Sequence, residues 1–136
     1  MSITLTDQDK TTLRTAAYGA VSLIASADAT GEPGKVATNG SIALSSATGP
    51  IGHVLAAKSK DIKLEGKSVA ELADQVLPAL TAAIGLLKKQ DPAEADNFRG
   101  TVLVAIEAAT QARKGESTPT LAEMTRKITA ALDAAV

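Results

Sequence analysis

The chain has 136 residues, a formal net charge of −1, no cysteine and 1% aromatic residues. The lack of cysteine excludes disulfides and cysteine-ligated zinc or iron–sulfur sites, and the lack of a basic excess gives no reason to expect a nucleic-acid partner. Because 45% of the residues are hydrophobic and 21% are charged, we expect one globular domain over residues 1–136. So few aromatic side chains favour helices over an all-β sandwich.

The first predicted helix follows Thr6, whose hydroxyl is placed to accept from a backbone N–H of the first turn. Asp7 and Asp9 fall in that turn, where the helix dipole favours negative charge. The helix is expected to end near Ala27, before the turn-forming sequence DATGEPG. Its apolar residues recur with helical spacing: Leu13, Ala17, Ala20, Val21 and Ile24.

Residues 28–66 hold most of the glycines and are expected to be irregular, with two short helices. The first would lie within residues 34–48 and the second around residues 51–58. The alternating stretch at residues 61–65 has no partner strand in the sequence, so we expect extended chain there. The residues at helical spacing in these two short helices are Val36, Gly40, Ala43 and Ala47, and then Ile51, Val54, Leu55 and Lys58.

The segment from residue 68 to residue 89 is expected to form a central helix. Ser68 and Glu71 are spaced as a capping box, in which each side chain accepts a backbone N–H of the other residue. Pro78 lies well inside the segment, and because the apolar spacing keeps its phase across it, we expect a kink and not a stop. The predicted face is broad: Val69, Leu72, Ala73, Val76, Leu77, Leu80, Ala83, Ile84 and Leu87.

The next helix is expected to start at Asp91 as N-cap, with Pro92 at the first helical position and Glu94 completing a capping box. It should pack centrally against the preceding helix as an antiparallel hairpin. A final helix should begin near STPTLAEM, with Thr118 or Thr120 as its N-cap. The predicted buried residues of these two helices are Ala95, Phe98, Val102, Leu103, Ile106 and Ala109, and then Leu121, Met124, Ile128, Ala131, Leu132 and Ala135.

The sequence therefore predicts a single compact all-α domain, similar to a helical bundle, of about five to seven helices. It predicts no catalytic, cofactor-binding or metal-ligating residue. His53, the only histidine, has no second histidine or H-x-x-E spacing near it, so we place it on the solvent-facing or boundary side of a short helix. Asp91, Glu94 and Asp96 could attract a hard cation, but capping already explains the first two.

Other candidate motifs fail on their spacing. GEPGKVATNG lacks the Ser or Thr that follows the lysine in a phosphate-binding loop, because Val36 follows Lys35. Ser41, Ser45 and Ser46 lie in no G-x-S-x-G turn, so a serine nucleophile is not indicated.

Four stretches carry a resemblance: LRTAAYGAVSLIASAD, VLPALTAAIGLL, DPAEADNFRGTVLVAIEAATQA and STPTLAEM. In their order and packing pattern they resemble a family of small uncharacterised bacterial all-helical proteins, over most of the chain outside residues 28–66. The layout is also similar to the TerB-like helical domain of tellurite resistance. That resemblance implies divalent-metal binding through acidic residues, but no such position matches here, so no site residue is carried over.

For function we favour a non-enzymatic cytoplasmic domain that binds a protein partner, in the first place a second copy of itself. Small residues at helical spacing, such as Ala16 with Ala20 or Gly19 with Leu23, permit close helix contact within the domain or between copies. A binder of small apolar ligands, with a pocket between helices, is the alternative, and an enzyme comes third. No run approaches about 18 apolar residues and no signal-peptide pattern is present, so we expect no membrane partner.

Overall fold

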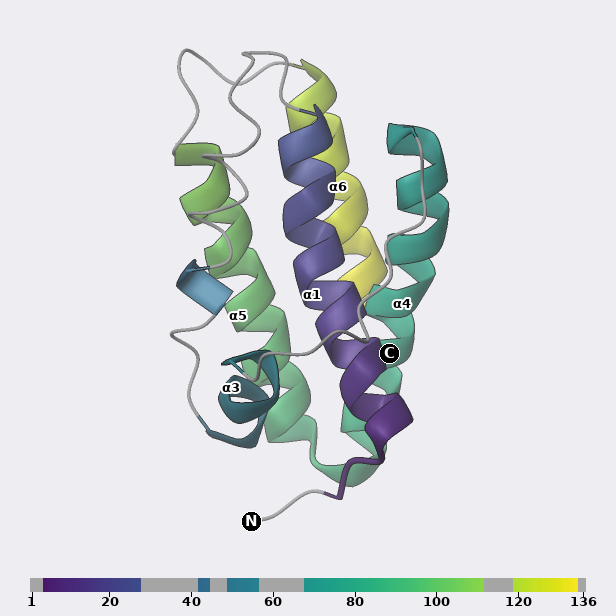
Figure 1. Cartoon of the computed structure of the whole chain (residues 1–136), viewed down its shortest axis with the longest axis vertical. Helices are drawn as coiled ribbons and strands as arrows, with labels where there is room; N and C mark the ends of the chain where they lie inside the picture. Colours follow the sequence, from purple (N-terminus) through teal and green to yellow (C-terminus); the bar gives the residue numbers. More distant parts are fainter. Residues whose placement is uncertain (1–3, 28–41, 45–48, 57–67, 112–118, 135–136) are drawn as a thin grey trace.

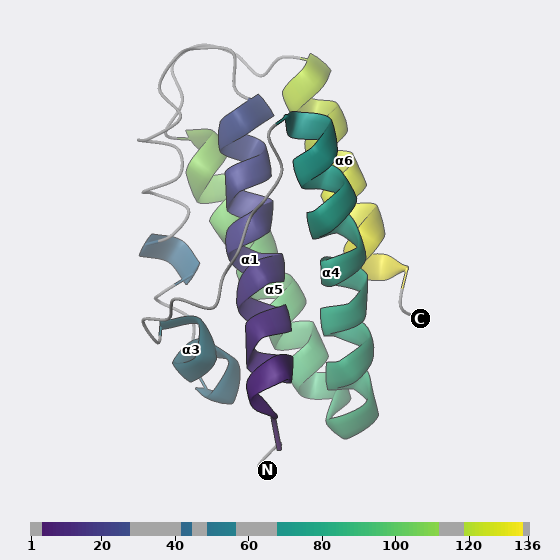
Figure 2. The same ribbon diagram turned by 45° about the vertical axis from the view of Figure 1, so that its right-hand side comes forward.

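The computed structural model describes residues 4–27, 42–44, 49–56, 68–111 and 119–134, and in these ranges it contains helices and no strand (Figure 1). The predicted all-α class is confirmed. Four long helices and one short one are α1 (Asp7–Ala27), α3 (Gly49–Ala56), α4 (Val69–Gln90), α5 (Pro92–Gln111) and α6 (Pro119–Asp133). In Figures 1 and 2, α1 lies between α4 on one side and α3 on the other.

Helix α1 begins as the sequence predicts. The Thr6 hydroxyl accepts from the Asp9 N–H at 3.0 Å, and Asp9 Oδ2 accepts from the Thr6 N–H at 3.1 Å, so the two residues form a reciprocal cap. All five predicted apolar positions of α1 are buried. Helix α1 also contacts each of the other four helices, and most extensively α4.

The close contact of α1 with α4 depends on Gly19. A Cβ atom added at Gly19 would lie 2.5 Å from Cγ2 of Val76, so no side chain fits there without movement. Ala16 and Ala20 are fully buried on the same helix. The small residues that could have formed a dimer face are therefore used inside the domain, where they let two helix backbones approach.

Helix α4 starts at its predicted cap, where the Ser68 hydroxyl accepts from the Glu71 N–H at 3.2 Å, and it continues through Pro78. Six residues of its predicted face are buried, and Ala73 and Leu77 are partly buried against them. The six are Leu72, Val76, Leu80, Ala83, Ile84 and Leu87. By length and composition it could also cross a membrane, because residues 70–90 have a mean hydropathy of 1.3. Since α4 contacts α1, α5 and α6, its apolar face is also what a core helix of a bundle needs.

The predicted hairpin of α4 and α5 is confirmed, with Asp91 as its one connecting residue. The Asp91 N–H donates to the Leu87 carbonyl at 2.7 Å, and Asp91 Oδ1 accepts from the Ala93 N–H at 3.0 Å. One residue thus ends α4 and caps α5. The expectation that this pair forms the centre was wrong, because the small residues of α1 bring α1 and α4 into the largest contact.

Helix α6 packs against α4 and is tied to it by a hydrogen bond of 2.7 Å from the Thr81 hydroxyl to the Ala131 carbonyl. It begins at Pro119, so Thr120 lies inside the helix and cannot be its cap. The other candidate, Thr118, lies outside the described residues, as does Ala135. The four large apolar residues predicted for the buried face are confirmed: Leu121, Met124, Ile128 and Leu132.

In the segment 28–66, the structure describes residues 42–44 and α3. The predicted second short helix is confirmed, with Val54 and Leu55 buried. Its last carbonyls are held by α1: the Tyr18 hydroxyl donates to Leu55 O at 2.5 Å and Arg14 Nη1 donates to Val54 O at 3.4 Å. These carbonyls lack partners within the helix, and the arginine charge suits the negative end of its dipole. Most of the predicted helix at 34–48 and the chain at 61–65 lie outside the described residues.

Candidate functional site

The structure places His53 on the exposed side of α3, as predicted. Within the described ranges, no three histidine, aspartate or glutamate side chains come together as a set that could hold a metal ion. His53 therefore belongs to no such metal-binding set in this part of the molecule.

The three acidic residues at the start of α5 have separate surroundings. Asp91 is 8% exposed and caps the helix, as predicted. Glu94 does not complete the capping box, because the Asp91 N–H donates to a carbonyl of α4 and Glu94 Oε2 is buried without a hydrogen-bond partner in the described part of the chain. Asp96 points to another region of the molecule, where it lines a pocket.

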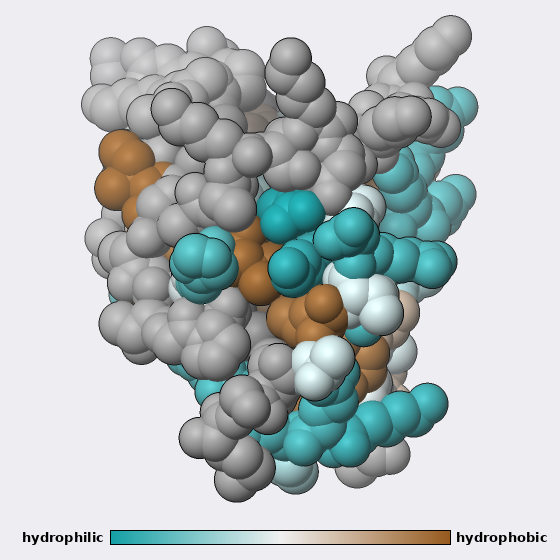
Figure 3. Space-filling model, turned by 60° about the horizontal axis from the view of Figure 1, so that its bottom comes forward, coloured by the Kyte–Doolittle hydropathy of each residue, from teal (hydrophilic) through white to brown (hydrophobic). Residues whose placement is uncertain are grey.

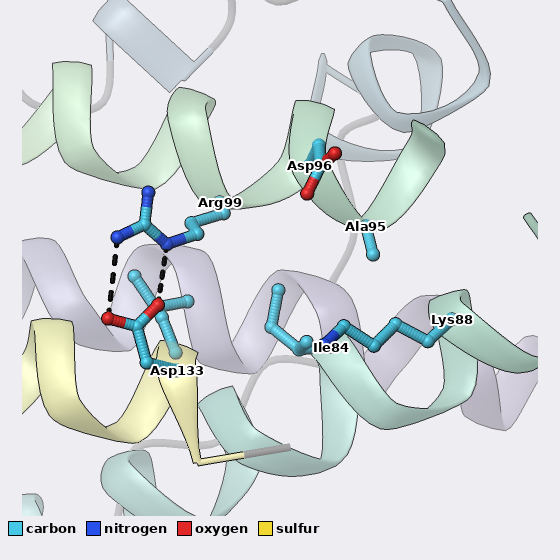
Figure 4. Close-up of a pocket in the computed structure, with 7 residues that line it drawn as sticks. Ile84, Lys88, Ala95, Asp96, Arg99 and Asp133 are labelled. Atoms are coloured by element: carbon cyan, nitrogen blue, oxygen red, sulfur yellow. Dashed lines mark hydrogen bonds and ion pairs between the residues drawn. The ribbon is translucent and has the colours of Figure 1, made fainter. Parts of the chain in front are cut away.

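That pocket lies where the end of α4, the first half of α5 and the end of α6 meet (Figure 4). Its volume is about 370 Å³, at the small end of the range of ligand pockets. Four of its seven lining residues are charged, so it does not have the apolar character expected for a binder of purely apolar ligands. The lining residues are Ile84, Lys88, Ala95, Asp96, Arg99, Leu132 and Asp133.

One wall of the pocket is an ion pair between α5 and α6. Arg99 Nε donates to Asp133 Oδ1 at 2.7 Å, and Arg99 Nη2 donates to Oδ2 at 3.4 Å, so the guanidinium holds both carboxylate oxygens (Figure 4). The hydrogen bond from Arg99 lowers the pKa of Asp133 below 3.8, and the charge of Lys88 adds to this effect. The same hydrogen bond raises the pKa of Arg99, to which the charge of Asp96 also contributes.

The four charges alternate in sign around the pocket. The positive charge of Lys88 lowers the pKa of Asp133, which is paired with Arg99. The negative charge of Asp96 in turn raises the pKa of Arg99. Lys88 and Asp96, at the two ends of this series, form no ion pair with any described residue. The core side chains Ile84, Ala95 and Leu132 complete the lining of the pocket.

Sequence reasoning missed this pocket. Asp96 was considered only with Asp91 and Glu94, and Arg99 is separated from Asp133 by 34 positions. Nothing in the spacing of single charges on three helices shows that their ends converge. The pattern of apolar residues predicted which faces pack, but not how far each helix slides along its neighbour.

Two described surface positions carry large exposed apolar side chains: Val104 on α5 is 57% exposed and Ile42 is 62% exposed. Gly100, one turn before Val104, is also exposed, and no heavy atom lies within 4 Å of the position that its Cβ would take. Toward the end of the molecule that carries the α4–α5 corner, Figure 3 shows hydrophilic side chains interspersed with apolar ones.

The described part of the chain thus offers two surfaces to consider, the charged pocket and the outer face of α5 around Gly100 and Val104. Comparisons with protein-family models, with curated proteins and with solved structures found no match to this chain, so its resemblance to bacterial helical families and to TerB-like domains stays a prediction.

Proposed function

We propose that this chain is a non-enzymatic helical domain that works by binding another protein chain, with a second copy of itself as the first partner. The contact surface in this proposal is the outer face of α5, around Gly100 and Val104. The observation that carries the proposal is the exposure of Val104. This side chain belongs to a residue that is 57% exposed, whereas the other large apolar residues of α5 are buried or partly buried in the core.

Gly100 supports the same surface. Because it has no side chain and faces open space, the backbone of a second helix can come close at this point, and Val104 then lies one turn away to be covered. A two-fold axis would bring the same patch of both copies together. The net charge of −1 adds little repulsion between two copies.

Sedimentation velocity over a range of micromolar concentrations tests this proposal. The wild-type chain should sediment increasingly as a dimer as concentration rises, and Val104→Asp should remain a monomer because a carboxylate would have to be buried at the contact. Ala82→Asp, at an exposed position of α4, is the matched control and should dimerise like the wild type. A wild-type chain that stays monomeric, or equal loss in both variants, contradicts the proposal.

We expect this protein to work in the cytoplasm, because a chain without cysteine has no disulfide to lose in reducing conditions. Fractionation of cells that express the chain checks this expectation, and recovery in the membrane fraction would contradict it. That outcome would direct attention to the apolar composition of α4.

A further inference from the structure

The geometry points to the α4–α5–α6 pocket as a binding site for a small zwitterion with an aliphatic part, of the class of α-amino acids with a branched aliphatic side chain. This inference is independent of the association proposed above, because Gly100 and Val104 are not among the residues that line the pocket.

The charges of the pocket carry the inference. Arg99 and Asp133 are already satisfied by one another through two hydrogen bonds, whereas Lys88 and Asp96 are not ion-paired to any described residue. A ligand anion beside Lys88 and a ligand cation beside Asp96 would continue the alternation of sign around the pocket. A ligand with a single charge would pair with one of these two exposed groups and leave the other to water, so it would gain only one of the two charge-assisted contacts.

The apolar part of the lining determines the rest of the ligand. Ile84 from α4, Ala95 from α5 and Leu132 from α6 are core residues that also line the pocket. An aliphatic side chain placed there removes apolar surface from water on both sides of the contact. A volume of about 370 Å³ is sufficient for a single amino acid and small for a larger metabolite.

Titration of the ¹⁵N-labelled full chain with four probes, followed by NMR amide shifts, tests the inference. The probes are L-leucine, 4-methylpentanoate without the ammonium, 3-methylbutylamine without the carboxylate, and glycine without the side chain. Leucine should shift the amide signals of the lining residues and bind about tenfold more tightly than each of the other three, since each of these loses one set of contacts.

Charge-removing variants locate the site. Lys88→Met, which keeps the aliphatic stem, and Asp96→Asn should each weaken leucine binding by about tenfold. Lys89→Met and Asp74→Asn are exposed controls outside the pocket lining and should leave the affinity unchanged. The inference is overturned if leucine produces no saturable shift, if a singly charged probe or glycine binds equally well, or if the control variants weaken binding to the same extent.

Discussion

Gly19 is the residue at which adding one methyl group should have the clearest effect. In Gly19→Ala, the new Cβ would lie 2.5 Å from Cγ2 of Val76, a β-branched side chain that cannot easily rotate away. Overpacking of this kind costs about 1–3 kcal/mol, and the better helix propensity of alanine returns about 1 kcal/mol. We expect a lower free energy of unfolding, measured by urea denaturation.

Two further variants separate the contact from the backbone effect. Gly19→Ala should cost much less in a Val76→Ala background, with a coupling of about 0.5–3 kcal/mol in the double-mutant cycle. Gly100→Ala, where no heavy atom lies within 4 Å, should instead stabilise the monomer by about 1 kcal/mol. An equal cost of Gly19→Ala in both backgrounds would show that Val76 is not the cause.

Asp133 should make the stability depend on pH in the acid range. Its pKa in the folded chain is held below 3.8 by Arg99, so the stabilisation is fully present above the unfolded pKa and is lost as the pH falls through the lower folded value. Asp133→Asn should therefore show a smaller drop in the urea midpoint below about pH 4. The effect is small because the two side chains are 40% and 53% exposed.

Arg99→Gln provides the matching variant for this pH dependence. Without the guanidinium, the Asp133 carboxyl loses the group that lowers its pKa, so the acid-range drop should shrink as it does in Asp133→Asn. An acid-range drop of wild-type size in both variants would assign the pH dependence to other carboxylates.

The free energy of unfolding should depend on the Asp91 side chain at the corner between α4 and α5. Asp91→Ala removes the acceptor of the Ala93 N–H at a position that is 8% exposed, and a lost N-cap costs about 0.5–2 kcal/mol. Asp74→Ala, at an exposed position inside α4, should change the free energy of unfolding by no more than about 0.5 kcal/mol. Denaturation of both variants checks the prediction, and equal costs would mean that the cap contributes nothing specific.

The starts of α1, α4 and α5 could be predicted from the sequence because caps are local. Thr6, Ser68 and Asp91 each act within three residues of the backbone N–H groups that they satisfy. The hydrogen bonding of Glu94 could not be predicted in the same way. The Asp91 N–H, from which Glu94 was expected to accept, donates instead to a carbonyl of α4. A local pattern does not reveal a competing partner from another element.

The buried faces were also largely predictable, since helical spacing selects one side of each long helix whatever its neighbours are. What could not be predicted was the position of each helix along the others. Two contacts depend on that position: the close approach of Gly19 to Val76, where an added Cβ would lie 2.5 Å from Cγ2, and the pairing of Arg99 with Asp133. The pocket therefore could not be predicted, because the sequence shows its charged residues but not that they lie close together in the fold.

At the scale of the whole molecule, the core formed by the described residues contains one phenylalanine, one methionine and otherwise aliphatic side chains and alanines, with the half-buried Tyr18 at its edge. Leu80 on α4 is fully buried, so Leu80→Ala should lower the free energy of unfolding by about 2–5 kcal/mol. That is a large part of the total of about 5–15 kcal/mol for an ordinary domain. Lys127→Ala, at an exposed position of α6, should change it by no more than about 0.5 kcal/mol. Guanidinium denaturation compares the two, and an unchanged midpoint in Leu80→Ala would contradict the packing of the core.

The hydrogen bond from Tyr18 to the Leu55 carbonyl has an optical consequence. The chain contains one tyrosine and no tryptophan, so its intrinsic fluorescence reports on a single phenol, located at the junction of α1 and α3. Separation of α3 from α1 would break this bond and expose the half-buried ring to water, while the circular dichroism of the four long helices would change little. The molecule therefore carries its own spectroscopic probe of one helix junction, and comparing the two signals during unfolding will show whether α3 leaves first.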